Sequence, residues 1–139
     1  MLDLHLRHRQ ETAISTSTAL TDALTALAAA AQVPRREGAP TTSWRWSVRQ
    51  RMTTVRDALM QATSATDDGW LAARGGVAFR ERNVLLGRLG DLGTEVLENP
   101  DVDQVQSLVL RLAHDISHHL QKVHDLAYDD VELELGGSE

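Results

Sequence analysis

The sequence contains no cysteine among its 139 residues. Disulfide bonds, cysteine-based zinc sites and thiol catalysis are therefore excluded. Long apolar runs are also missing, since none approaches the ~20 residues that a membrane-spanning helix needs. The stretch from Met1 to His5 lacks the layout of a signal peptide. A soluble cytoplasmic protein of one domain is the expectation.

Lysine is nearly absent, because thirteen of the fourteen basic residues are arginine. The net charge of −6 comes from the C-terminal segment, where residues 125–139 hold six acidic residues and no Lys or Arg. The first 124 residues contain fourteen acidic and fourteen basic residues, so their net charge is zero. This overall acidity argues against nonspecific binding to nucleic acid, which needs positive charge to neutralise phosphates.

Glycine and proline divide the chain into four segments of helical periodicity. Apolar residues recur at steps of three, four or seven over 2–31, 42–66, 77–98 and 101–130. The breaks fall at 32–40, which contains two prolines, at 67–69 and 75–76, and at 99–101. One further helical turn is expected at 70–74. In the last break, Asn99 is expected to cap the helix that follows, with Pro100 at its first position.

These segments predict an all-α fold, an antiparallel up-down-up-down four-helix bundle over residues 1–130. A short acidic C-terminal tail is expected at 131–139. The side chains expected to face the core are those of Leu2, Leu6, Ala13, Leu20, Ala23, Leu24, Leu27, Ala31, Val48, Met52, Val55, Leu59, Ala62, Leu85, Leu89, Leu92, Val96, Val102, Val105, Val109, Leu112, Ile116, His119, Val123 and Leu126.

Four of the six histidines lie in the last predicted helix. In an antiparallel bundle, residues equally far from one end lie at similar heights. This order brings His5, Glu81, His119 and His124 toward one end, with Asp129 just beyond. Helical bundles hold transition metals through such nitrogen and carboxylate ligands on facing helices. The alternative is that His119 hydrogen-bonds Glu81 or a backbone carbonyl at the edge of the core, with His5 and His124 half exposed.

A second pair, His114 and His118, is spaced four residues apart, which also suits a metal. These residues project away from the apolar line of their helix, toward Asp115, Gln121 and Lys122. A solvated outer face is therefore the favoured interpretation of this pair.

Three stretches carry a resemblance to a known family: residues 69–76, residues 80–86, and residues 118–137 with the spacing His124-x-x-x-x-Asp129. With the size, the helix order and the early His5, they resemble the bacterial hemerythrin-like family, in particular its small actinobacterial members. Oxygen-handling members hold a di-iron centre with ligands from all four helices. Only His5, His124 and Asp129 carry over, because 42–66 contains neither His nor Glu and 77–98 contains no His. The resemblance thus implies a degenerate member that keeps the scaffold.

Arginines on the second predicted helix form a candidate partner-binding surface. Arg45, Arg49 and Arg56 fall on one face, with Trp44 and Trp46 nearby. Such a patch can dock an acidic partner or a phosphate. The alternative is a solvated face, with the tryptophans covering the end of the bundle.

The C-terminal tail is the second candidate partner-binding surface. Val131, Leu133 and Leu135 alternate with Glu132 and Glu134, a pattern that can pair as an edge strand or occupy a groove on another protein. The alternatives are packing across the end of the bundle, or disorder. The arginine patch of the chain itself is one possible partner for this tail.

Catalytic motifs are missing from the sequence, which has no Gly-x-Ser-x-Gly elbow and no phosphate-binding glycine loop. The first hypothesis is therefore a noncatalytic interaction or regulatory module without a cofactor, which binds a protein partner or self-associates. The second is a hemerythrin-like protein that binds iron, manganese or zinc through His5, His119, His124 and Asp129, assisted by Glu81. An enzyme that uses the His119–Glu81 pair is the third.

Overall fold

The computed structural model describes the backbone of residues 2–65 and 76–136 and the side chains of residues 17–62 and 76–126. Within these ranges the chain forms four α-helices and no strand: α1 (Leu2–Ala31), α2 (Thr42–Ala65), α4 (Val77–Glu98) and α5 (Val102–Gly136). Apart from the end of α5, every boundary lies within one residue of its prediction. The turn expected at 70–74 lies outside the described residues.

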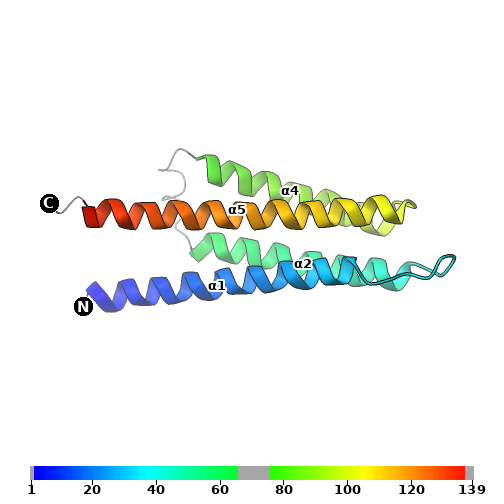
Figure 1. Ribbon diagram of the computed structural model, residues 1–139, viewed down its shortest axis with the longest axis horizontal. Coiled ribbons are helices and arrows are strands. Elements are labelled where there is room, and N and C mark those ends of the chain that lie inside the picture. The colour runs from blue at the N-terminus through cyan, green and yellow to red at the C-terminus, as the bar shows by residue number, and fades with distance from the viewer. Residues whose placement is uncertain (1, 66–75, 137–139) are drawn as a thin grey trace.

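The four helices lie side by side along the long axis of the molecule (Figure 1). α1 packs on α2, α2 on α4, α4 on α5, and α5 closes the ring against α1. The start of α1 and the end of α5 lie at the same end of the molecule (Figure 1). The prediction of an all-helical, four-helix bundle is confirmed for the described residues.

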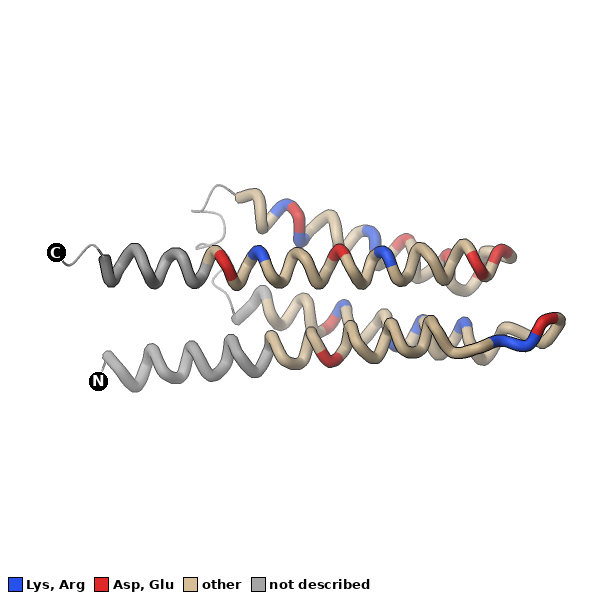
Figure 2. The backbone as a smooth tube through the Cα atoms, in the orientation of Figure 1, with Lys and Arg blue, Asp and Glu red and all other residues tan. Residues whose placement is uncertain are grey.

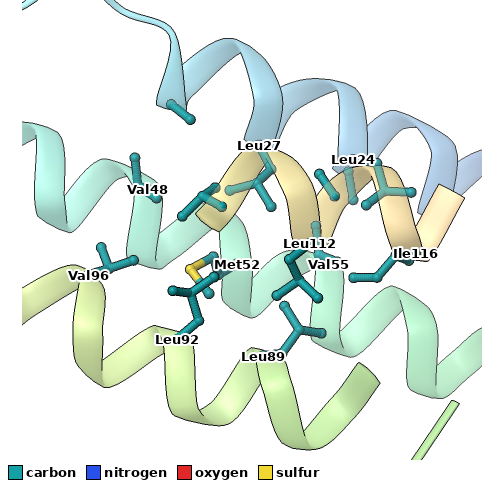
Figure 3. Packing of buried hydrophobic residues seen from close by; sticks show 14 of the residues in the cluster. Leu24, Leu27, Val48, Met52, Val55, Leu89, Leu92, Val96, Leu112 and Ile116 are labelled. Atoms are coloured by element: carbon teal, nitrogen blue, oxygen red, sulfur yellow. The ribbon is translucent and has the colours of Figure 1, made fainter. Parts of the chain in front are cut away.

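The core is formed by one apolar stripe from each helix (Figure 3). Leu27 of α1, Met52 of α2, Val96 of α4 and Ile116 of α5 are each at most 2% exposed. Every apolar side chain expected to face inward between Leu20 and Leu59 and between Leu85 and Ile116 is buried, apart from Val102, which is partly buried. Those of Leu2, Leu6 and Ala13 lie outside the described side chains. Ala62, Val123 and Leu126, which were also expected to face inward, are only partly buried. The helical periodicity of the sequence thus predicted the core correctly from Leu20 to Leu59 and from Leu85 to Ile116.

The connection from α4 to α5 differs from its prediction. Asp101, rather than Asn99, caps α5, because the Gln104 backbone N–H donates to Asp101 Oδ1 at 3.1 Å. Asn99 closes a turn before the helix, in which its Oδ1 accepts from the Asp101 N–H at 2.8 Å. Pro100 lies between the two and outside the helix, since α5 begins at Val102. The capping residue is therefore two positions later than predicted.

The end of α5 is the second difference. The helix continues to Gly136, past the boundary expected near Asp130. Residues 132–135 are leucine and glutamate, which are good helix formers. Their helix propensity therefore determined the local structure, and the alternation with period two, which suggested a strand, did not. The segment 131–136 is thus a helical continuation in its backbone, and residues 137–139 lie outside the described part.

Candidate functional site

A buried histidine on α5 meets a glutamate on α4. His119 is 5% exposed, and its Nδ1 lies 2.8 Å from Glu81 Oε1. Lys122, one turn further along α5, donates from Nζ to Glu81 Oε2 at 2.9 Å. These three residues are named the Glu81 cluster below. The hydrogen bond between His119 and Glu81, one of the two alternatives from the sequence, is confirmed.

The local sequence explains why the Glu81 cluster forms. Glu81 lies four residues before Leu85, so both lie on the side of α4 that faces the core. His119 follows Ile116 by three residues and occupies the next position on the buried line of α5. Lys122 follows His119 by three residues, which places it above His119 on the side of α5 that faces α4. That spacing was readable from the sequence, although Lys122 was assigned to the outer face.

The electrostatics of the cluster favour the ionised carboxylate. The hydrogen bond from Lys122 is the largest cause that holds the pKa of Glu81 below its ordinary value of 4.5. Burial acts in the opposite direction, and the hydrogen bond with His119 lowers the pKa further. Both oxygens of Glu81 are therefore committed to side chains of α5 in its charged form.

His124 lies on a different side of α5 from His119. It is exposed, and its Nε2 lies 2.6 Å from Ser17 Oγ on α1. Five residues along a helix correspond to a rotation of about 140°, so that His119 faces α4 while His124 faces α1. The structure thus brings Glu81 and His119 together and directs His124 elsewhere.

The remaining predicted metal ligands, His5 and Asp129, have side chains outside the described ones. Among the side chains of residues 17–62 and 76–126, no three of His, Asp or Glu lie close enough together to hold a metal ion. Surface hollows of about 220, 330 and 300 Å³ lie between α4 and α5, beside the 32–41 loop, and between α1 and α5. None of these three is lined by the Glu81 cluster.

At the opposite end of the bundle, named the loop end, Trp44 is buried, as one alternative from the sequence had it, whereas the contacts of Arg35 and Gln106 there were not predicted. The Ala31 carbonyl, left without an N–H partner where α1 ends, accepts from Trp44 Nε1 at 3.3 Å and from Gln106 Nε2 at 2.7 Å. Arg35 lies over the Trp44 ring, 4.5 Å from its centroid, and donates to Asp103 Oδ1 at 2.9 Å. Trp44 precedes Val48 by four residues, and this spacing was a readable signal of its burial.

Two of the three arginines proposed as partner-binding make contacts within the chain. Arg45 donates from Nη1 to the Val96 carbonyl of α4 at 2.9 Å. This carbonyl would otherwise face residue 100, a proline without an N–H. Arg49 lies across Gly93 of α4, where an added Cβ would come within 3.1 Å of the guanidinium group. Both arginines therefore help to join α2 to α4.

The outward side of α2 carries large exposed side chains. Trp46 is 60% exposed and Met60 is 48% exposed. Residues 46, 53 and 60 are spaced by seven and lie on one side of the helix, with the exposed Arg56 beside them. Figure 2 marks the basic positions along this helix. The side chains of Val131, Leu133 and Leu135, the other proposed partner-binding residues, lie outside the described ones.

No family model, no curated protein and no solved structure matches this chain. Within the described part, none of the helices combines the length and apolar character needed to cross a bilayer. The contacts described above therefore carry the functional inference.

Proposed function

We propose that this protein is a noncatalytic interaction module, an up-down-up-down four-helix bundle that docks through the outward side of α2. The helix order is supported by contacts at both ends. At the loop end, Ala31 contacts Trp44 and Gln106. At the other end, α1 meets α5 through Ser17 and α4 meets α5 through Glu81. These contacts support an order in which each helix reverses the direction of the one before it.

The docking face is defined as Trp46, Thr53, Arg56 and Met60 of α2. The observation that carries the proposal is the 60% exposure of Trp46, since a tryptophan in water leaves a large apolar area uncovered. Tryptophan, methionine and arginine are also the residue types enriched at protein interfaces. An exposed tryptophan beside Met60 and Arg56 therefore fits the centre of a binding surface.

A partner with an acidic surface can pair with Arg56, the exposed basic side chain of this face. A second copy of the chain has that property, because the net charge of the protein is −6. Self-association through the docking face is thus the form of the proposal that can be tested with the protein alone.

The noncatalytic assignment is supported by the Glu81 cluster, in which both carboxylate oxygens already have protein partners.

Sedimentation velocity from micromolar to submillimolar concentrations tests the proposal. The wild type is expected to associate, and Trp46→Ala and Arg56→Glu are expected to weaken association by about thirtyfold or more, as truncation of a central interface residue does. Arg51→Glu is the matched control, because Arg51 is an exposed arginine on another side of α2. A wild type that stays monomeric throughout, or equal losses in all three variants, would refute docking through this face.

Metal binding is the second candidate function. Its support is the contact between Glu81 and His119, which places two of the five proposed ligands on facing helices. We infer that descent from a hemerythrin-like protein would leave an incomplete set of metal ligands of this kind. Elemental analysis of untagged protein, purified without chelator, tests it: iron, manganese or zinc near one equivalent, lost in Glu81→Gln and kept in His118→Gln, would support the site. Negligible metal after incubation with excess iron or zinc would remove it.

A further inference from the structure

The pair of histidines on the outer side of α5 differs from the other described histidines. His119 bonds Glu81 and His124 bonds Ser17, whereas His114 and His118 contact each other. Their ring centroids are 4.5 Å apart, with an angle of 70° between the ring planes. Both residues are exposed. Two imidazole rings thus lie against each other in solvent, one helical turn apart.

We propose that His114 and His118 form a chelating site for a divalent transition-metal ion of the Cu²⁺, Ni²⁺ or Zn²⁺ class. Imidazole nitrogen is a preferred ligand of these ions, and residues four apart on a helix are neighbours on its surface. With Zn–N bonds of about 2.0–2.1 Å, two tetrahedral imidazole ligands have centroids roughly 5 Å apart. The observed separation between the two ring centroids, 4.5 Å, is close to this value.

The surroundings of the pair leave the ion with open coordination positions. The nearest acidic residue in sequence, Asp115, is held by Arg88 at 2.9 Å on the side of α5 that faces α4. Two protein ligands of a four-coordinate ion leave two positions for water or for an added ligand. His114 also lines the hollow of about 300 Å³ between α1 and α5, beside Leu110 and Ala113. The ion would therefore lie at the rim of a groove lined by both apolar and hydroxyl side chains.

This site is independent of the docking face and of the proposed metal ligands at the end of the bundle. The docking face is on α2, whereas the pair is on α5. The His119–His124 candidate uses the α4 and α1 sides of α5. Loss of one function in a variant therefore has no bearing on the other.

Isothermal titration of the untagged protein with Ni²⁺ or Cu²⁺ tests the proposal. A His5→Gln/His8→Gln background removes the two histidines near the N-terminus as competing ligands. We expect one ion per chain, and a loss of about a hundredfold in affinity in either His114→Gln or His118→Gln, because the second bond of a chelate forms at a high effective concentration. Ser107→Gln is the matched control, since it introduces the same side chain at another exposed position of α5 and should leave the affinity unchanged.

Paramagnetic broadening of backbone amide resonances by Cu²⁺ gives the location of the ion. Residues 113–119 are expected to broaden first, and this pattern should disappear in His118→Gln. Circular dichroism establishes that the variants keep their helix content, as expected for substitutions at exposed positions. The proposal is overturned by a wild-type affinity no higher than that of His118→Gln. A loss in Ser107→Gln equal to that in His118→Gln would also overturn it.

Discussion

The two ends of the bundle are held together by different kinds of contact. At the loop end, besides the ion pair between Arg35 and Asp103, side chains donate to backbone carbonyls that the helices leave without partners. Trp44 and Gln106 donate to Ala31, and Arg45 donates to Val96. At the opposite end, named the histidine end, side chains bond to one another. Examples are Glu81 with His119 and Lys122.

The difference concerns both burial and charge. Trp44 is 7% exposed, whereas the side chain of Lys122 is 63% exposed. Hydrogen bonds between a buried side chain and a backbone carbonyl make a contribution to stability that varies little with pH. Exposed ion pairs contribute little and are screened by salt. We therefore expect the loop end to contribute most of the stability, and the histidine end to make the stability depend on pH.

The largest effect is expected for Trp44→Ala at the loop end. This change opens a cavity, removes the donor to Ala31 and leaves Arg35 without the ring on which it lies. It should lower the free energy of unfolding by about 3–5 kcal/mol, as for other buried tryptophans. Urea denaturation followed by circular dichroism measures this loss.

The neighbouring tryptophan supplies the control for this prediction. Trp46→Ala removes the same side chain at a position that is 60% exposed, and its cost should stay within about 0.5 kcal/mol. Similar losses in the two variants would contradict the assignment of Trp44 as the buried residue that closes the loop end.

The next effect is expected for Arg45→Met, which keeps the aliphatic part of the side chain and removes the guanidinium. The Val96 carbonyl then loses its donor, and Pro100 has no N–H to replace it. We expect a loss of about 1–3 kcal/mol, the cost of a polar group left unsatisfied away from water. Thermal unfolding measures it, with Arg51→Met, at an exposed position of α2, as the matched control.

The helix boundaries and the core could be predicted because their causes are local. Proline and glycine end helices wherever they occur, and the apolar periodicity determines which side of each helix is buried. His119 was placed correctly for this reason, since it continues the buried line after Ile116. The contact with Glu81 agrees with the expectation that Glu81 and His119 lie at similar heights in the bundle.

The contacts made by long side chains could not be predicted in the same way. Arg45 and Lys122 reach a neighbouring helix through several rotatable bonds, and the choice of partner depends on how far apart the helices pack. Arg45 was therefore taken for a surface residue. His124 was grouped with His119 by height alone, although a five-residue step turns it toward α1. The cap at Asp101 was missed because three consecutive residues all suit the start of a helix.

A pH-dependent loss is expected at the histidine end. Because the pKa of Glu81 lies below 4.5 in the folded protein, its carboxylate stabilises the fold above that value. The contribution is lost as the pH falls below 4.5 and through the lower folded pKa. Glu81→Gln should therefore reduce the free energy of unfolding by about 1 kcal/mol at neutral pH, a size typical of a partly exposed charged hydrogen bond.

Urea denaturation of the wild type and Glu81→Gln between neutral and acidic pH tests this assignment. The difference between the two proteins should shrink as the pH falls below 4.5. The same series with Trp44→Ala is the comparison from the loop end, where the difference from the wild type should be nearly constant. A difference for Glu81→Gln that stays constant, or grows in acid, would contradict a stabilising charge at this position.

The smallest effect is expected for Ser17→Ala, which removes the hydrogen bond with His124 at the histidine end. His124 is exposed, so water replaces the lost partner, and alanine is the better helix former inside α1. These two effects oppose each other, and the free energy of unfolding should change by less than about 0.5 kcal/mol.

Ser107→Ala, at an exposed position within α5, reports the effect of helix propensity alone. A cost in Ser17→Ala of more than about 1 kcal/mol relative to Ser107→Ala would mean that exposed side-chain pairs hold α1 to α5. The contrast between the two ends would then lie in pH dependence and no longer in strength.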